Sequence, residues 1–196
     1  MTTGARAWAS LAALLCVLAL LARALPAGAI DWQPGLALQQ PWRAFSAAAL
    51  HYSLLHLGAN LAGALLVGAL GVTARVPRHV AWAWFFAWPL TQWGLLIEPA
   101  LTHFGGLSGV LHAAVAIVAV HLMLTATGRR RAIGAATFVV LCIKVLGESP
   151  WGPPLRLLPE WDIAVAPLAH ASGLVAGVLC VLVAETMVRI RRPHGA

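Results

Sequence analysis

The chain has 196 residues, of which 61% are hydrophobic and 10% are charged. Soluble globular domains carry about 25% charged residues, so this composition excludes an ordinary soluble protein of this size. The formal net charge is +7. Because the basic residues gather at alternate ends of the apolar runs, the charge indicates membrane topology rather than nucleic-acid binding.

Six apolar runs follow one another along the chain, and a bilayer crossing needs about 20 such residues. The runs cover residues 8–25, 45–72, 80–97, 107–127, 132–146 and 163–188. We therefore predict one all-α integral membrane domain over residues 1–196, built as a bundle of six transmembrane helices. The first run could also be read as a signal peptide, with Arg6 before it. We favour a retained helix because an even number of spans fits the charges.

Basic residues mark one set of loops and ends, namely Arg6, Arg75, Arg78, Arg129, Arg130, Arg131, Arg189, Arg191 and Arg192. The other set carries Asp31, Glu98, Glu148, Glu160 and Asp162, with Arg23, Arg43 and Arg156. By the positive-inside rule, this pattern places both termini in the cytoplasm. The second, fourth and sixth helices then run from the outside to the inside.

The second run carries three polar side chains, His51, His56 and Asn60, in an otherwise apolar sequence. His56 and Asn60 are four residues apart and share a helix face. Polar groups at membrane depth are costly and normally face the bundle interior or water. We interpret His51 as an interfacial residue and assign the pair His56 and Asn60 to function.

The start of the fourth run is the most informative stretch, because Ser108 lies between Gly106 and Gly109 where a loop leads into a long helix. Glycine permits a tight turn and close approach by another chain. A serine there would have free backbone N–H groups beside it, which suit a developing anion. His112 lies one turn further on the same face, whereas a simple small-residue packing motif is the alternative interpretation of the glycines.

The sixth run begins with a small-residue face formed by Gly173 and Gly177, which lets another helix approach closely. The fourth run offers a matching face through Gly109 and Ala113. If the two faces pack, His170 comes within hydrogen-bond reach of Ser108. In the fifth run, Lys144 and Glu148 are four residues apart, and we expect a local ion pair near the outer end.

Taken together, these residues resemble the rhomboid family of intramembrane serine proteases. The resemblance rests on Trp42-Arg43, on His51, His56 and Asn60 at their spacing, on Gly106-Leu107-Ser108-Gly109 and on Ala169-His170 with Gly173 and Gly177. It covers roughly residues 42–185. It implies that Ser108 is the nucleophile and His170 the general base. It also implies an oxyanion hole made by His56, Asn60 and the backbone at Leu107 and Ser108.

Two features are similar to the bacterial rhombosortase subgroup: His112 in Gly-Leu-Ser-Gly-Val-Leu-His, and the compact chain with Lys144 and Glu148 in its fifth run. This resemblance implies a transmembrane protein substrate whose C-terminal anchor contains a Gly-Gly segment and ends in a basic tail. It also implies a bacterial inner membrane location with the active site toward the periplasmic side. Because no carboxylate lies near His170 in the second, fourth or sixth run, we predict a Ser-His dyad, with His112 stacking on or orienting His170.

Two other function classes remain to be weighed. A haem- or metal-binding membrane protein could use His51, His56, His112 and His170, but the sequence has no His-Glu-x-x-His motif and no acidic groups to support such ligands. A catalytically inactive rhomboid-like chaperone would not need both Ser108 and His170. We therefore expect an enzyme that needs no cofactor and no metal.

Overall fold

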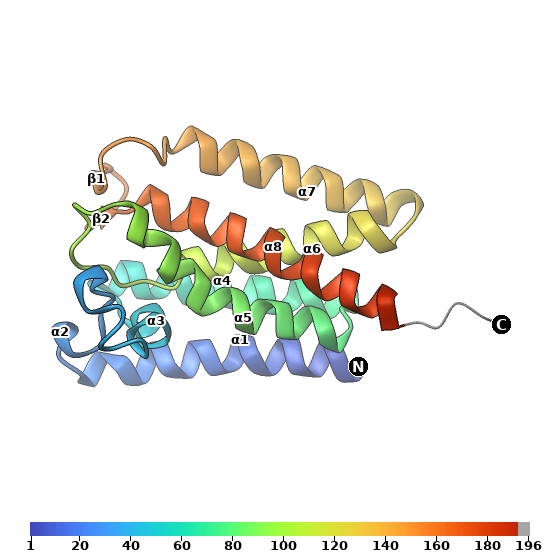
Figure 1. Cartoon of the computed structure of the whole chain (residues 1–196), viewed down its shortest axis with the longest axis horizontal. Coiled ribbons are helices and arrows are strands. Elements are labelled where there is room, and N and C mark those ends of the chain that lie inside the picture. Colours follow the sequence, from blue (N-terminus) through green and yellow to red (C-terminus); the bar gives the residue numbers. More distant parts are fainter. Residues whose placement is uncertain (192–196) are drawn as a thin grey trace.

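The computed structural model describes residues 1–191, and in this range six long helices lie side by side (Figure 1). They are α1 (Thr3–Leu21), α4 (Leu54–Ala74), α5 (Arg78–Trp93), α6 (Ser108–Thr125), α7 (Gly128–Gly147) and α8 (Pro167–Arg191). The shorter elements are α2 (Ala27–Ile30), α3 (Arg43–Ser46), and the antiparallel strands β1 (Arg156–Leu157) and β2 (Ala164–Val165).

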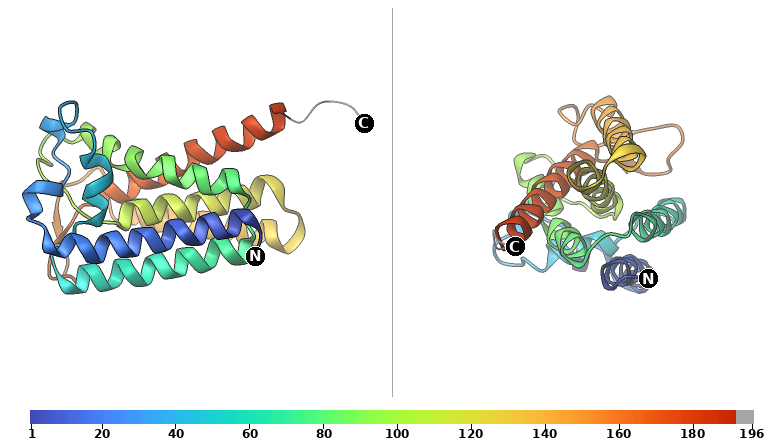
Figure 2. Two further views of the ribbon diagram at one scale, coloured as in Figure 1. Left: turned by 90° about the horizontal axis from the view of Figure 1, so that it is seen from below. Right: turned by 90° about the vertical axis from the view of Figure 1, so that its right-hand side faces the viewer.

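Successive long helices alternate in direction, so α4, α6 and α8 all begin at the same end of the bundle (Figures 1 and 2). That end also carries α2, α3 and the β1–β2 pair, whereas α1 begins and α8 ends at the opposite end. The central element is α6, of which 67% is buried, against 28–39% of the other strongly apolar helices. Residues at the start of α6 are thereby placed inside the bundle.

Within residues 1–191, four segments are long and apolar enough to cross a membrane: Thr3–Ala24, Leu54–Ala74, Ser108–Thr125 and Pro167–Arg191. The two remaining long helices differ from them for simple reasons. α5 has only 16 residues, and α7 begins with Arg129, Arg130 and Arg131. A helical membrane protein is therefore supported, and the prediction of six crossings with cytoplasmic termini stays a prediction.

The prediction of a second helix over residues 45–72 is wrong for residues 45–53, because α4 begins only at Leu54. The structure has α3, a 3-10 turn at Ala47–Ala49 and an extended segment before α4 begins at Leu54. Ser53 stops an earlier start, because its Oγ accepts a hydrogen bond from the His56 backbone N–H at 3.0 Å and so caps the helix. His51 consequently lies in the loop that leads into α4.

Other boundaries also shift by a few residues. The sixth helix begins at Pro167 rather than 163, because residues 164–165 pair with β1 and a proline suits the first helical turn. The first helix begins at Thr3, where the Thr2 hydroxyl accepts from the Ala5 N–H, and not at 8. The third and fifth helices start at 78 and 128 instead of 80 and 132, and the fourth covers 108–125 instead of 107–127.

A buried ion pair fixes the loops at the end of the bundle where α4, α6 and α8 begin. Arg43 Nη1 donates to Asp31 Oδ1 and to the Asp31 carbonyl oxygen, both at 2.9 Å. The other Asp31 oxygen lies 2.6 Å from His103 Nδ1. Reciprocal backbone bonds between Trp32 and Phe104 add to this connection. The segment after α1 is thus tied to the loop that enters α6.

The predicted contact between the small faces of α6 and α8 is present, and it brings the two backbones together. A Cβ on Gly109 would lie 2.6 Å from the Ala169 carbonyl oxygen. A Cβ on Gly173 would overlap the Gly109 carbonyl oxygen, and one on Gly177 would overlap that of Ala113. Three glycines are therefore required for the helices to cross at this separation.

We expect Gly173→Ala to destabilise the protein by about 1–3 kcal/mol, because the added methyl group meets backbone rather than a movable side chain. The measurement is thermal unfolding of the purified protein in detergent. The matched control is Gly58→Ala, since a Cβ at this helical glycine meets nothing within 4 Å. Equal stability of the two variants would contradict the close helix crossing.

Candidate active site

Ser108 is the first residue of α6, and the backbone before it is folded tightly. Gly106 has φ +150°, a conformation that side-chain-bearing residues rarely adopt, and its N–H donates to the Ala47 carbonyl oxygen at 2.9 Å. A Cβ on Gly106 would also lie 3.1 Å from Cε1 of His56. Glycine at this position therefore lets the His56 ring lie against the chain just before Ser108.

The N-terminus of α6 has no side-chain cap at Leu107. Within residues 1–191, the backbone N–H groups of Leu107 and Ser108 make no hydrogen bond to protein. The first N–H groups of a helix lack intrahelical partners and carry its partial positive charge. This leaves two donors beside the Ser108 hydroxyl.

His170, in the first turns of α8, lies directly opposite Ser108. Its Nε2 is 2.9 Å from Ser108 Oγ, and the residue is 6% exposed. The backbone contact between α6 and α8 involves Gly109, directly after Ser108, and Gly173, one turn after His170, and it sets this distance. The two side chains thus form a hydrogen-bonded pair at the ends of two tightly packed helices.

A carboxylate also reaches His170. It comes from outside the second, fourth and sixth helices, so the predicted Ser-His pair has a third member that the prediction does not include. Glu148, the residue that follows α7, places Oε2 at 2.6 Å from His170 Nδ1. Its other oxygen pairs with Lys144 at 2.9 Å, which confirms the predicted local ion pair. The carboxylate comes from the end of the fifth long helix, whereas the predicted site draws on the second, fourth and sixth.

His112 stacks on His170, with ring centroids 4.2 Å apart and planes inclined by 15°. Its Nδ1 is 2.7 Å from the Ser108 carbonyl oxygen, and its Nε2 is 2.6 Å from Lys144 Nζ. Lys144 Nζ also lies 3.1 Å from His170 Nδ1, and the shorter 2.6 Å contact of that nitrogen with Glu148 Oε2 assigns its proton. His112 carries its proton on Nδ1 and accepts from Lys144, whereas His170 donates from Nδ1 to Glu148 and accepts from Ser108 at Nε2.

His56 and Asn60 are both buried on the α4 wall of the site. Asn60 Nδ2 donates to the His56 carbonyl oxygen at 3.0 Å, which uses one of its two amide protons. Within the described residues, Nδ1 of His56 is buried without a hydrogen-bond partner. Each side chain therefore keeps hydrogen-bonding capacity beyond its contacts with protein.

The loop before α4 is electrically neutral where it meets the site. Burial lowers the pKa of His51 below its ordinary value, so this imidazole is uncharged near pH 7. Burial and the Asp31 carboxylate raise the pKa of Tyr52 to about 12, so its phenol keeps its proton. His51 packs against His56 with ring centroids 4.8 Å apart and does not itself contact Ser108.

These groups face a cavity of about 890 Å³ that lies between α4 and α7. Its polar lining includes Ser108, His170, His56, Asn60, His112, Lys144 and Glu148. Apolar side chains of the same helices and of the β1–β2 loop line the remainder, among them Val67, Leu111, Leu141 and Ile163. The cavity is large enough to accept a polypeptide segment of several residues.

The structure brings nearly all the sequence-predicted site residues together. Gly106 and Leu107 position Ser108, and Gly109, Gly173 and Gly177 make the helix contact. The four histidines of the metal-binding alternative form two separate ring pairs, His51 with His56 and His112 with His170. Glu148 is the site residue that the predicted catalytic set lacks. The feature that points to it in the sequence is its spacing of four from Lys144 at the end of an apolar run.

The fold and this site define a helical membrane protein with a serine–histidine pair that faces a cavity. A family model, the Rhomboid domain, matches residues 38–185 of the chain. The chain therefore belongs to the rhomboid family, and membership supports an intramembrane protease function. A search of curated proteins found no match.

Proposed function

We propose that this protein is a serine endopeptidase in which Ser108 attacks a peptide carbonyl carbon and His170 acts as general base. The observation that carries the proposal is the 2.9 Å contact between Ser108 Oγ and His170 Nε2 at the cavity surface. A serine hydroxyl is a weak nucleophile until a base at this distance accepts its proton. Neither residue is needed in this form for helix packing, which the neighbouring glycines provide.

The proton path follows from the assigned tautomers. As Ser108 Oγ bonds to the carbonyl carbon, its proton passes to His170 Nε2, and His170 then protonates the leaving amine. Water attacks the resulting ester with the same group as base. Glu148 accepts the hydrogen bond from His170 Nδ1, which holds the productive tautomer and stabilises the imidazolium that forms.

The negative charge on the substrate oxygen needs donors on the side of Ser108 away from His170. The backbone N–H groups of Leu107 and Ser108 are available there, and His56 and Asn60 lie on the facing α4 wall. Donors fixed before the reaction stabilise the transition state without reorganisation. We assign these four groups to the oxyanion hole.

Variants of the Ser108–His170 pair and variants of the oxyanion hole should lose activity to different extents. Ser108→Ala and His170→Ala should abolish cleavage, and Ser108→Ala should also abolish labelling by a fluorophosphonate. Asn60→Ala and His56→Ala each remove one donor and should lower kcat by about 10²–10³-fold, because the backbone donors remain. The measurement is cleavage of a membrane-anchored reporter by equal amounts of inserted protein. Cleavage by the Ser108→Ala protein would refute the nucleophile, and full activity of both oxyanion-hole variants would refute their assignment.

Glu148 is assigned as a positioning residue, so its removal should act on kcat more than on KM. We expect Glu148→Ala to lower kcat by about 10²-fold or more, because His170 loses the partner of its Nδ1–H. The control is Lys144→Met, which removes the cation and leaves the carboxylate, and which should cost less. Glu148→Asp should restore part of the kcat. An unchanged kcat in Glu148→Ala would contradict the positioning role of Glu148 and would indicate a Ser108–His170 dyad that works without a carboxylate.

We further propose that the single membrane domain crosses the bilayer six times with both termini in the cytoplasm of a bacterium. Supporting this, α4, α6 and α8 all begin at one end of the bundle. Most of the described arginines, among them Arg75 and the arginines at positions 129–131, lie at the opposite end, and only Arg23, Arg43 and Arg156 lie at the end where α4 begins. By the positive-inside rule, the end that carries Ser108 then faces the periplasmic side of the inner membrane. A juxtamembrane segment of a substrate would reach Ser108 from that side.

The proposed substrate is a protein with a C-terminal membrane anchor that begins with a Gly-Gly segment, as the resemblance to rhombosortases suggests. Glycine costs about 1 kcal/mol per residue in a helix relative to alanine, so such a pair favours local unwinding. It also leaves the backbone uncovered for approach to Ser108. A basic tail after the anchor would keep the substrate C-terminus in the cytoplasm.

We expect a reporter with such an anchor to be cut at or beside its outer end, releasing the exported domain. The measurement is co-expression with and without this protein, followed by mass spectrometry of the new C-terminus. The matched control replaces the two reporter glycines by leucines and should be cut far more slowly. Equal cleavage of both reporters would refute the Gly-Gly preference and leave the protease assignment intact.

A further inference from the structure

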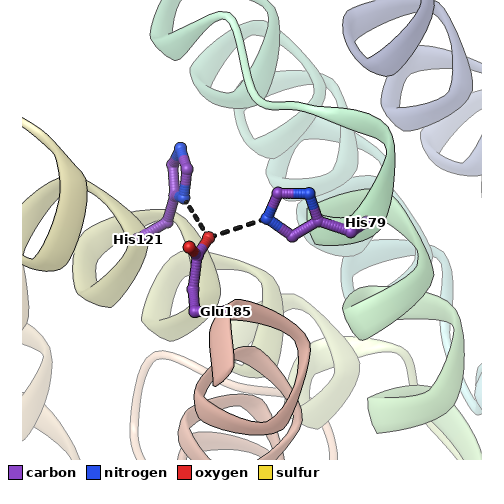
Figure 3. A group of neighbouring side chains, drawn as sticks. All are labelled: His79, His121 and Glu185. Carbon is purple, nitrogen blue, oxygen red and sulfur yellow. Dashed lines mark hydrogen bonds and ion pairs between the residues drawn. The ribbon is translucent and has the colours of Figure 1, made fainter. Parts of the chain in front are cut away.

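A second polar cluster lies at the end of the bundle opposite Ser108, near the ends of three helices. It consists of His79 in the first turn of α5, His121 near the end of α6, and Glu185 near the end of α8 (Figure 3). Thirteen residues separate His121 from Ser108 along α6, which corresponds to roughly 20 Å. The cluster is therefore distinct from the candidate active site.

The two imidazoles converge on one carboxylate oxygen. His121 Nδ1 is 2.7 Å and His79 Nε2 is 2.8 Å from Glu185 Oε1. The three donor atoms all lie within 4.8 Å of one another. Figure 3 shows both rings directed at the carboxylate from opposite sides.

Glu185 is 5% exposed, and a buried carboxylate requires a compensating charge. Arginines are plentiful at this end of the bundle, yet within residues 1–191 none pairs with Glu185, whose ionic contacts are the two histidines. Unlike arginine, histidine carries no permanent positive charge. A bound cation would supply the missing positive charge.

From this geometry we propose that His79, His121 and Glu185 bind a divalent transition-metal ion of the Zn²⁺ class. Two histidines and one glutamate are an established zinc donor set, whereas Ca²⁺ and Mg²⁺ prefer oxygen ligands alone. Ligand atoms on one zinc ion lie about 3–4 Å apart, given bond lengths near 2.0–2.2 Å. The observed spacing thus needs only small side-chain rotations.

Binding exchanges two hydrogen bonds for coordination. Each imidazole binds the metal through the ring nitrogen that faces Glu185 and holds its proton on the other ring nitrogen, and Glu185 supplies a carboxylate oxygen. The His79 side chain is 28% exposed, against 10% for His121 and 7% for Glu185. His79 therefore marks the side from which the ion enters. The bound ion would join α5, α6 and α8.

The test is metal content of the full-length protein, purified in detergent on an affinity tag that contains no histidine. The protein is stripped with chelator, given Zn²⁺ or Co²⁺, desalted and analysed by elemental mass spectrometry. We expect about one ion per chain, visible ligand-field bands with Co²⁺, and a higher Tm with Zn²⁺. Glu185→Gln and His79→Ala should each weaken metal binding by about 100-fold or more. Loss of a metal ligand lowers metal affinity at least as much as loss of a residue that hydrogen-bonds to a ligand.

The matched control is His170→Ala, which disrupts the other histidine cluster and should keep the full metal content and the Co²⁺ bands. Loss of metal in His170→Ala but not in His79→Ala would place the ion at the candidate active site and overturn the proposal. Failure of the parent protein to retain stoichiometric Zn²⁺ would also overturn it. His79 is the most exposed of the three side chains, so His79→Ala decides the question if Glu185→Gln does not fold.

Discussion

The close crossing of α6 and α8 is the constraint on which the candidate site depends. Gly109, Gly173 and Gly177 have no side chains, so the two backbones touch where larger residues would keep them apart. Lipid provides little hydrophobic drive for helix association, and membrane helices therefore rely on such packing. The same contact fixes the starts of both helices, and Ser108 and His170 lie there at 2.9 Å.

The polar groups of the site are arranged so that each compensates its neighbour. The Glu148 carboxylate accepts a hydrogen bond from His170 and pairs with Lys144. Lys144 also donates a hydrogen bond to His112, and His112 donates one to the Ser108 carbonyl oxygen. In a medium of low dielectric constant, an incomplete network of this kind would be costly. Lys144 Nζ lies 2.6 Å from His112 Nε2 and 3.1 Å from His170 Nδ1, so one amine contacts both of the stacked rings.

Much of this arrangement could be predicted from the sequence, because it rests on local spacing. Small residues at Gly173 and Gly177, with His170 one turn away, predict which helix faces meet and which side chain follows. The Lys144–Glu148 pair was predicted for the same reason. The break between α3 and α4 could not be predicted because residues 43–53 contain no glycine or proline that would interrupt a helix, and only the Ser53 cap shows where α4 starts.

Contacts between distant segments could not be predicted in this way. Glu148 lies 22 residues from His170 and on a different helix, and no periodicity relates the two. The Asp31–Arg43 pair and the convergence of His79, His121 and Glu185 likewise depend on how loops and helices cross. Hydropathy reports which residues enter the membrane, but it carries no information about the partners that buried polar groups find there.

The members of the site are held by elements of different rigidity. Ser108 and His170 belong to helices in backbone contact, whereas Glu148 follows α7, which packs mainly on α6 and only lightly on α8. Most of α7 remains outside the core, and of its 20 residues only Gly134, Leu141 and Val145 are buried. The cavity lies between this helix and α4. A displacement of α7 would therefore separate Glu148 from His170 while leaving Ser108 and His170 together, so the hydrogen-bonded network of Ser108, His170 and Glu148 is complete only while α7 is docked.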